Sequence, residues 1–205
     1  MKPAPGSVIA DKYRLDRPLG EGGMGMVWVA THIELGLEVA IKFMHSKLVH
    51  DELGRARFKQ EAKAAAKIRS SHVARITDYG SHAGLAYMVL ELMVGEDLST
   101  HLKRRHSSRM SLARTAEIVT SLSKGLEAAH NAGILHRDIK PSNVFLAQVD
   151  GVEVVKILDF GVAKALGSGL TDSVKTSSDV LVGSPRYMSP EQIRTDPPDR
   201  RSDLW

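Results

Sequence analysis

The hydrophobic pattern of this chain changes near residues 92–95, from short β-branched runs to helical periodicity. Before that point the apolar runs are separated by turn signals, which predicts an antiparallel sheet. Five strands are expected, over residues 13–19, 26–32, 38–44, 73–79 and 85–91. A chain of 205 residues is long enough for one domain or two small lobes, and the change of pattern favours two lobes.

Residues 51–68 are expected to form one helix within the sheet-rich half. Phe58, Glu61, Ala65 and Ile68 recur at helical spacing and share one face. Glu61 therefore lies on the buried face of this helix, where a carboxylate needs a cation.

The second half is predicted to be mainly helical. A short helix follows Asp97, and Ser111 is suited to cap a long helix that ends at Gly133. The apolar face of the long helix consists of Leu112, Ala116, Val119, Leu122, Leu126 and Ala129. Short strands are expected near residues 134–135, 144–146 and 154–157, followed by a Ser/Thr-rich loop over 167–178.

Composition narrows the class of protein. There is no cysteine, so disulfides and thiolate metal sites are excluded and the cytoplasm is the expected compartment. No apolar run approaches the ~20 residues that cross a bilayer, so we expect no membrane segment in this chain. The net charge of +4 includes one basic cluster, which we interpret as a solvated helix end: Lys103, Arg104, Arg105 and Arg109. No stacking aromatic residues accompany it, so nucleic acid is not an expected partner.

Residues 20–27 fit the pattern G-x-G-x-x-G-x-V through Gly20, Gly22, Gly25 and Val27. Between two strands, such glycines let backbone N–H groups approach phosphate oxygens closely. A flexible hairpin has the same composition, so the pattern alone is weak evidence. A dinucleotide site of the Rossmann type needs a helix after the glycines, whereas a strand is predicted here.

Lys42 ends the apolar strand Val39-Ala40-Ile41-Lys42. A lysine at such a place is often a surface residue whose stem lies along the sheet. Glu61 changes this interpretation, because a carboxylate on a buried helix face needs a cation and Lys42 is the natural one. A Lys–Glu pair beneath a glycine flap would clamp phosphates.

Two acidic motifs follow the long helix. The first is His136-Arg137-Asp138 with Lys140 and Asn143, and the second is Asp159-Phe160-Gly161. Each tripeptide can occur by accident, and two solvated turn aspartates are the alternative. In this order and spacing the motifs gather carboxylate and amide oxygens, which suit Mg²⁺ together with bound phosphates.

With these motifs in this order, the chain resembles the protein kinase family, specifically bacterial Ser/Thr kinases of the eukaryotic-like type. The resemblance implies an α+β, two-lobed protein-kinase-like fold. Its N-lobe would be a five-stranded antiparallel sheet plus one helix, and its helical C-lobe would be partial. The implied boundaries are an N-terminal extension at 1–12, an ATP-clamping N-lobe at 13–93 and the C-lobe at 94–205.

The resemblance also implies roles for individual residues. Asp138, as the base, would be catalytic together with Lys140 and Lys42, while Asn143 and Asp159 would hold Mg²⁺ or Mn²⁺. Lys42 with Glu61 would hold the α- and β-phosphates of ATP, and Leu90 would be the gatekeeper. The implied nucleotide-binding residues are Leu19, Gly20, Gly22, Gly25, Val27, Ala40, Lys42, Glu61, Glu91, Met93 and Asp97.

Substrate and regulatory features follow from the same resemblance. Lys140, two residues after Asp138, is what Ser/Thr-specific members carry. Residues 183–191 resemble the substrate-binding segment, with Ser189 in place of the usual Ala. Arg137 marks members whose loop is ordered by phosphorylation. The predicted phosphosites are Thr176 and Ser178, then Thr171 and Ser173.

The family's remaining helices would follow Trp205, so the chain resembles a C-terminally truncated kinase domain. Glu191 would then lack its arginine partner, and the apolar face of the long helix would be partly bare. A membrane anchor in the missing region would place the protein at the cytoplasmic face of the membrane.

Three functional hypotheses remain open at this point. An active kinase would act on protein substrates, including its own activation loop, and a dimer of the chain is one further expected partner. The alternatives are a nucleotide-binding module without turnover and an inactive fragment. Intact Lys42, Asp138 and Asp159 favour the active kinase.

Overall fold

The computed structural model describes residues 3–22, 25–44, 52–104, 109–160 and 185–205. Within these ranges the chain forms two compact units. The first contains residues up to 66 together with 75–92, and the second contains 67–74, 93–160 and 185–205. No helix in the described ranges is long and apolar enough to cross a membrane.

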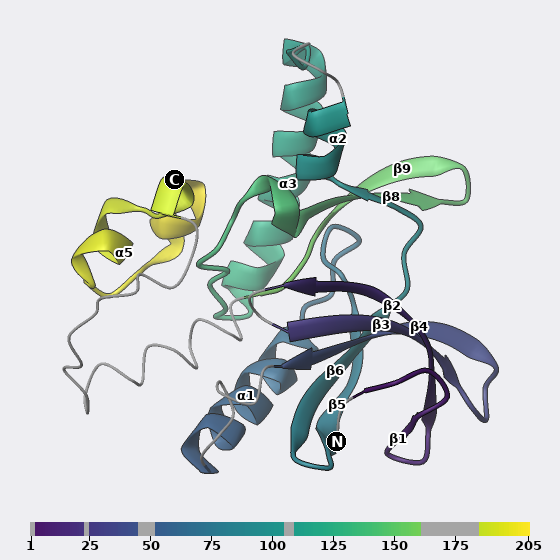
Figure 1. The fold of residues 1–205 in the computed structure, drawn as a ribbon. Coiled ribbons are helices and arrows are strands. Elements are labelled where there is room, and N and C mark those ends of the chain that lie inside the picture. The colour runs from purple at the N-terminus through teal and green to yellow at the C-terminus, as the bar shows by residue number, and fades with distance from the viewer. Residues whose placement is uncertain (1–2, 23–24, 45–51, 105–108, 161–184) are drawn as a thin grey trace. The chain divides into compact units, whose positions relative to one another are not determined.

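The first unit is built on a six-stranded antiparallel sheet in the order β1-β2-β3-β4-β6-β5 (Figure 1). Its strands are β1 (Val8–Ile9), β2 (Tyr13–Gly22), β3 (Gly25–His32), β4 (Leu37–Met44), β5 (Ile76–His82) and β6 (Leu85–Glu91). The five expected strands are present, although β5 begins later than predicted. The sixth, β1, comes from the segment before Tyr13 and pairs with the start of β2.

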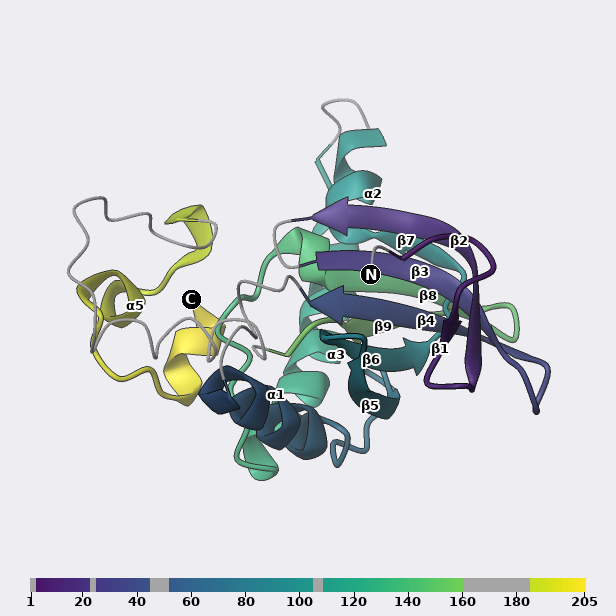
Figure 2. The ribbon, with the colours of Figure 1, turned by 60° about the horizontal axis from the view of Figure 1, so that its bottom comes forward.

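Side chains link strands that lie far apart in the order of this sheet. The Tyr13 hydroxyl on β2 donates to the Asp78 carboxylate on β5 at 2.9 Å. The Ala10 N–H, just after β1, donates to His82 Nδ1 on β5 at 3.3 Å. Since β1 and β5 are the two edge strands, these bonds require a sheet that curls toward a half-barrel, and Figure 2 shows this unit from a second side.

The two faces of the sheet have different neighbours. One face packs into an apolar core made of Ile9, Tyr13, Leu15, Trp28, Ala30, Ile41, Phe43, Tyr87 and Val89. On the other face, Met44 and Met88 pack against Phe58 and Ala62 of helix α1 (Glu52–Ala65). Helix α1 therefore covers part of the second face, and it corresponds to the helix predicted over 51–68.

The predicted strand at 73–79 starts three residues late because residues 72–74 belong to the second unit and bond to a strand there. The Ala74 N–H donates to the Ile157 carbonyl at 2.9 Å, and the Ile157 N–H donates to the His72 carbonyl at 2.9 Å. Val73 forms a parallel bridge with Ile157. These backbone groups are thus satisfied before β5 begins.

The second unit combines a three-stranded sheet with helices (Figure 1). Its strands are β7 (Gly95–Asp97), β8 (Val144–Val149) and β9 (Val152–Ile157). Its helices are α2 (Leu98–Arg104), α3 (Leu112–Asn131) and α5 (Pro190–Arg194), with 3-10 turns η2 (Pro141–Asn143), η4 (Pro185–Tyr187) and η5 (Arg200–Leu204). Residues 134–135 do not form the strand that the sequence predicted.

Helix α3 has the expected ends. The Ser111 side chain accepts from the Arg114 N–H, and Gly133 follows the helix with a left-handed φ of 75°. Ile118 and Leu126 are buried, whereas Leu112 is 89% exposed and Val119 is 53% exposed. The predicted apolar face is therefore bare in part, as expected.

Gly125 of α3 lies where no side chain fits. A Cβ added there would lie 2.8 Å from the His72 carbonyl oxygen and 2.8 Å from Ile157 Cδ1. We expect Gly125→Ala to destabilise the fold, because overpacking of about 1–3 kcal/mol outweighs the helix-propensity gain of about 1 kcal/mol. Urea unfolding measures the difference, with Lys124→Ala as the exposed neighbouring control. Equal or greater stability of Gly125→Ala would contradict this packing.

Candidate active site

Lys42 lies on β4 opposite Val27 of β3 and Met88 of β6, so these three side chains share one face of the sheet. Lys42 is only 7% exposed. Ala40 is two residues earlier on the same strand and projects to the same face, opposite Leu90 of β6. Several residues predicted to bind the nucleotide are thus brought together, on the face that α1 partly covers.

Two glycines of the G-x-G-x-x-G pattern meet different requirements. Gly25 has a φ of 143°, and a Cβ at this residue would lie 1.8 Å from the Phe43 carbonyl oxygen of β4. Glycine is therefore required there by the close approach of β3 to β4. Gly20, which pairs with Val27, has open space where a Cβ would be, and the preceding Leu19 is 47% exposed.

Two acidic residues expected at the nucleotide also belong to this unit. Glu61 is half-buried on α1, next to the fully buried Ala62. Its pairing with Lys42 stays a prediction. The Glu91 carboxylate accepts from the Arg75 N–H at 2.8 Å, which fixes the end of β6 against the residues before β5.

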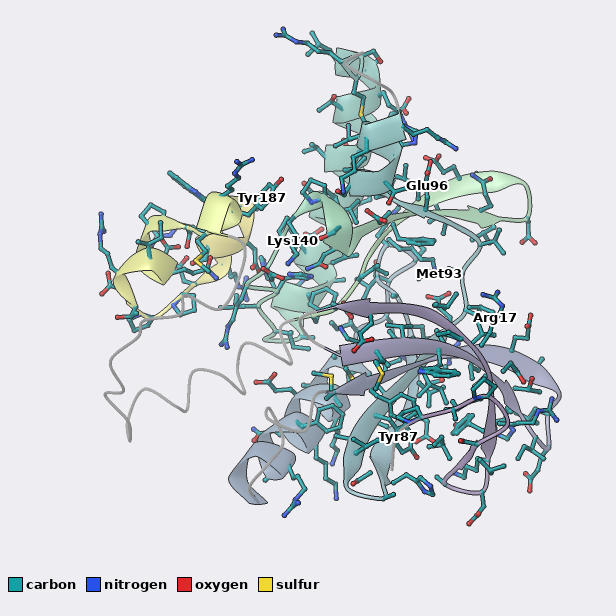
Figure 3. The ribbon with its side chains drawn as sticks, in the orientation of Figure 1. Arg17, Tyr87, Met93, Glu96, Lys140 and Tyr187 are labelled. Carbon is teal, nitrogen blue, oxygen red and sulfur yellow. The ribbon has the colours of Figure 1, made fainter. Side chains whose placement is uncertain are left out.

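Asp138 lies in the loop between α3 and β8 of the second unit and is 4% exposed. Its carboxylate oxygen Oδ2 lies 2.8 Å from Lys140 Nζ and accepts from Asn143 Nδ2 at 3.1 Å. Asn143 Nδ2 also donates to the Asp138 carbonyl at 2.8 Å. Figure 3 shows Lys140 in this loop, so the predicted catalytic Asp and Lys are adjacent.

Asn143 and Asp159, the predicted metal ligands, lie close together. The Leu158 N–H donates to the Asn143 carbonyl at 2.9 Å. Asp159, the next residue along the chain, therefore lies near Asn143. Both side-chain bonds of Asn143 use its amide nitrogen, which leaves the amide oxygen as the atom suited to a cation. In the described part of the chain, no three His, Asp or Glu side chains are grouped to hold a metal by themselves.

Such a pair of oxygen ligands fits Mg²⁺ that arrives with a nucleotide. Mg²⁺ is usually bound through one or two carboxylates plus substrate phosphates rather than by an all-protein cage. Asp159 adopts a left-handed φ of 55°, which is uncommon for a residue other than glycine.

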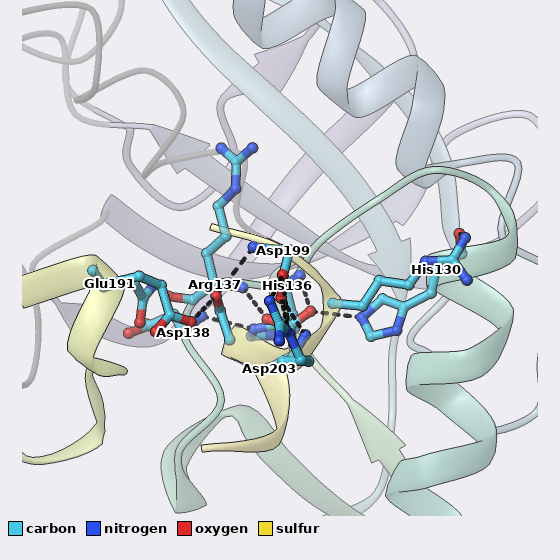
Figure 4. Close-up of polar contacts among 11 residues, drawn as sticks. His130, His136, Arg137, Asp138, Glu191, Asp199 and Asp203 are labelled. Atoms are coloured by element: carbon cyan, nitrogen blue, oxygen red, sulfur yellow. Dashed lines mark hydrogen bonds and ion pairs between the residues drawn. The ribbon is translucent and has the colours of Figure 1, made fainter. Parts of the chain in front are cut away.

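Asp203 holds the backbone of the loop that carries Asp138, the predicted base, a role that the sequence did not suggest (Figure 4). Its side chain is fully buried and accepts from His130 Nε2 at 2.8 Å. It also accepts from the backbone N–H groups of His136 at 2.8 Å and Arg137 at 2.6 Å. A single aspartate some 65 residues downstream of the loop gives no local sequence signal for this contact.

His136 is buried and contacts the segments on both sides of it. Nε2 donates to the Leu158 carbonyl at 2.7 Å, and Nδ1 accepts from the Asp138 N–H at 3.2 Å. The ring stacks edge-on against Phe160, with centroids 5.0 Å apart. Burial lowers the pKa of His136, so the neutral ring is the form that fits both bonds.

Asp97 and Phe145 face the same side of the small sheet, because they are paired across β7 and β8. The Asp97 carboxylate accepts from the Thr100 N–H at 3.0 Å and from the Thr100 hydroxyl at 2.6 Å, and so caps α2. Met93 is half-buried on the segment that enters β7. Phe145, a half-buried aromatic residue beside Asp97, was not anticipated from the sequence.

Some predicted residues lie outside the described residues, namely Gly161, Thr171, Ser173, Thr176, Ser178, Gly183 and Ser184. Glu191, which was expected to lack its arginine partner, accepts a hydrogen bond from the Ser202 hydroxyl. That bond lowers the pKa of Glu191.

Comparison with known proteins identifies the family. The sequence matches the protein kinase domain over residues 13–205. It is 39% identical to the serine/threonine-protein kinase pkn2 of Myxococcus xanthus, over 98% of this chain and 24% of that protein. It is 34% identical to the serine/threonine-protein kinase PknA of Mycobacterium tuberculosis, over all of this chain and 47% of that protein.

Solved structures agree with this result. The crystal structure of the Mycobacterium tuberculosis PknI kinase domain matches with a TM-score of 0.78 at 27% identity, covering 98% of this chain and 73% of that one. The chain belongs to the protein kinase family, and the predicted α+β kinase-like fold is confirmed. The chain spans from a quarter to a half of the length of the two curated relatives above.

The buried neutral His136 should make the fold sensitive to acid. In the unfolded chain, His136 takes up a proton near pH 6.5, whereas in the folded protein its ring is protonated only at a lower pH. The contribution of neutral His136 to stability is therefore fully present above pH 6.5 and is lost as the pH falls below it. We expect His136→Phe, which keeps an aromatic ring against Phe160, to lose less free energy of unfolding between about pH 7.5 and about pH 5.5. Identical losses in urea unfolding of both proteins would contradict the assignment.

Proposed function

We propose that this chain carries the catalytic region of a protein serine/threonine kinase, which transfers the γ-phosphate of ATP to Ser or Thr hydroxyls of proteins. The arrangement around Asp138 carries this proposal. A buried carboxylate is oriented by Lys140 and Asn143, and the backbone before it is fixed by Asp203. The names of the relatives agree with this reaction.

Asp138 would act as the base in this reaction. Its carboxylate would accept the proton of the substrate hydroxyl as that oxygen attacks the γ-phosphorus. Lys140 Nζ, which lies 2.8 Å from the same carboxylate, would neutralise negative charge on the transferring phosphoryl group. Asn143 donates to Oδ2 and would thereby keep the carboxylate turned toward the substrate.

The proposed ATP ligands are described for each unit separately. In the first, Leu19, Gly20, Gly22, Gly25, Val27 and Ala40 would contact the nucleotide, with Lys42 and Glu61 at the α- and β-phosphates. Glu91, Met93 and Asp97 would contact the base and ribose, and Phe145 is suited to pack against the base because it faces the same side as Asp97. Asn143 and Asp159 would hold Mg²⁺ or Mn²⁺, which neutralises phosphate charge.

The proposed partners are protein substrates, including this chain's own segment 171–178. Self-association as a dimer, a cytoplasmic location and attachment to a membrane through another region of the protein are parts of the same proposal. A nucleotide-binding module without turnover is the second candidate. The buried, oriented Asp138 favours the active kinase over it, because a module that only binds nucleotide needs no base.

Replacing the base tests this function. Asp138→Asn should lower phosphoryl transfer by roughly 10²–10⁴-fold, because general base catalysis contributes about that much. ATP affinity in isothermal titration should remain, since the proposed phosphate ligands are unchanged. Asp150→Asn, an exposed turn residue, is the control. Equal loss of ATP affinity would instead make Asp138 a phosphate or metal ligand.

Self-phosphorylation is a second test. Thr176 and Ser178, then Thr171 and Ser173, should become phosphorylated when the protein is incubated with Mg-ATP. A phosphate there carries about −1.5 to −2 charges and can pair with the Arg137 guanidinium. Mass spectrometry locates the sites, and a Thr176→Ala, Ser178→Ala double variant should have a lower rate. Phosphates at other positions, or a double variant with the full rate, would refute this switch.

A further inference from the structure

Gln192 on α5 forms a hydrogen bond to the loop between α3 and β8, which carries Asp138. Its Nε2 donates to the Arg137 carbonyl at 2.7 Å. Its Oε1 accepts from the Ser189 N–H at 3.1 Å and from the Ser189 hydroxyl at 3.4 Å, as part of a capping box. One amide side chain therefore joins the first turn of α5 to the residue that precedes Asp138.

The peptide group between Arg137 and Asp138 is held at both ends. Its carbonyl accepts from Gln192, and its N–H donates to His136 Nδ1. Arg137 has a left-handed φ of 63°, which a residue other than glycine keeps only where its surroundings enforce it. Rotation of this peptide group would turn the Asp138 side chain away from Lys140 and Asn143.

We propose that Gln192 is a positioning residue for Asp138, which it orients by donating to the Arg137 carbonyl. It thereby couples residues 189–191, the end of the segment 183–191 that resembles a substrate-binding segment, to the orientation of the base. This inference rests on the proposed kinase function. The Gln192 amide nitrogen positions the loop, whereas its amide oxygen caps α5.

Gln192→Glu separates the two tasks. Glutamate is also a standard capping-box partner, because its carboxylate accepts from the N-cap N–H. It cannot donate to the Arg137 carbonyl at neutral pH. A residue that only caps α5 would tolerate this change, whereas a positioning residue would not. Gln148→Glu is the matched control, because Gln148 is exposed on β8 and the charge change is the same.

The experiment compares wild type, Gln192→Glu and Gln148→Glu in the full-length protein. Gln192→Glu should keep the thermal unfolding midpoint and the KM for ATP, while kcat falls roughly three- to tenfold, the equivalent of one lost hydrogen bond. Amide hydrogen exchange in residues 134–140 should become faster in Gln192→Glu alone.

Both readouts must change for the inference to hold. If either kcat or the exchange rate of Gln192→Glu equals that of wild type, Gln192 only caps the helix. If wild type transfers no phosphate, the kinase proposal fails, and hydrogen exchange alone then decides whether Gln192 holds the loop.

Discussion

The loop that carries Asp138, the proposed base, depends on one buried carboxylate. Asp203 is fully buried, and an unpaired charge in that position would cost several kcal/mol. The backbone N–H groups of His136 and Arg137 in turn need acceptors, and the Asp203 oxygens supply them. Each group thus satisfies the other, and together they keep Arg137 in its left-handed conformation.

Other contacts extend this constraint to the Asp138 side chain. His136 accepts from the Asp138 N–H and reaches the Leu158 carbonyl, which connects the loop to the residues before Asp159. Lys140 and Asn143 then orient the Asp138 side chain. This rigidity suits phosphoryl transfer, in which the protein contributes mainly positioning and electrostatic stabilisation.

In the first unit, strand register determines which side chains lie together on one face of the sheet. Antiparallel pairing puts Val27, Lys42 and Met88 side by side on one face of the sheet. Trp28, Ile41 and Val89 are paired with one another beside that set and belong to the core on the opposite face. Because side chains alternate along a strand, a slip of one residue would bury Lys42 in that core and expose the apolar set.

The sequence predicted most elements because their signals are local. Ser111 and Gly133 mark the ends of α3, and β-branched runs locate the strands. The prediction was less accurate where backbone groups bond to distant partners. Val73 and Ala74 were assigned to a strand of the first sheet, yet they pair with Ile157. The segment before Tyr13 was taken as an extension, yet it supplies β1.

The sequence by itself determined the family and the chemical identity of the site, since the order of Gly20, Lys42, Asp138, Asn143 and Asp159 is a linear property. Tertiary structure alone decided what holds those groups. Asp203 and Gln192 lie more than fifty residues from the loop they bond, and a hydrogen bond depends on distance in space rather than along the chain. Contacts in space also explain Gly25. The glycine pattern suggested contact with phosphate, but the missing side chain of Gly25 makes room for the β4 backbone.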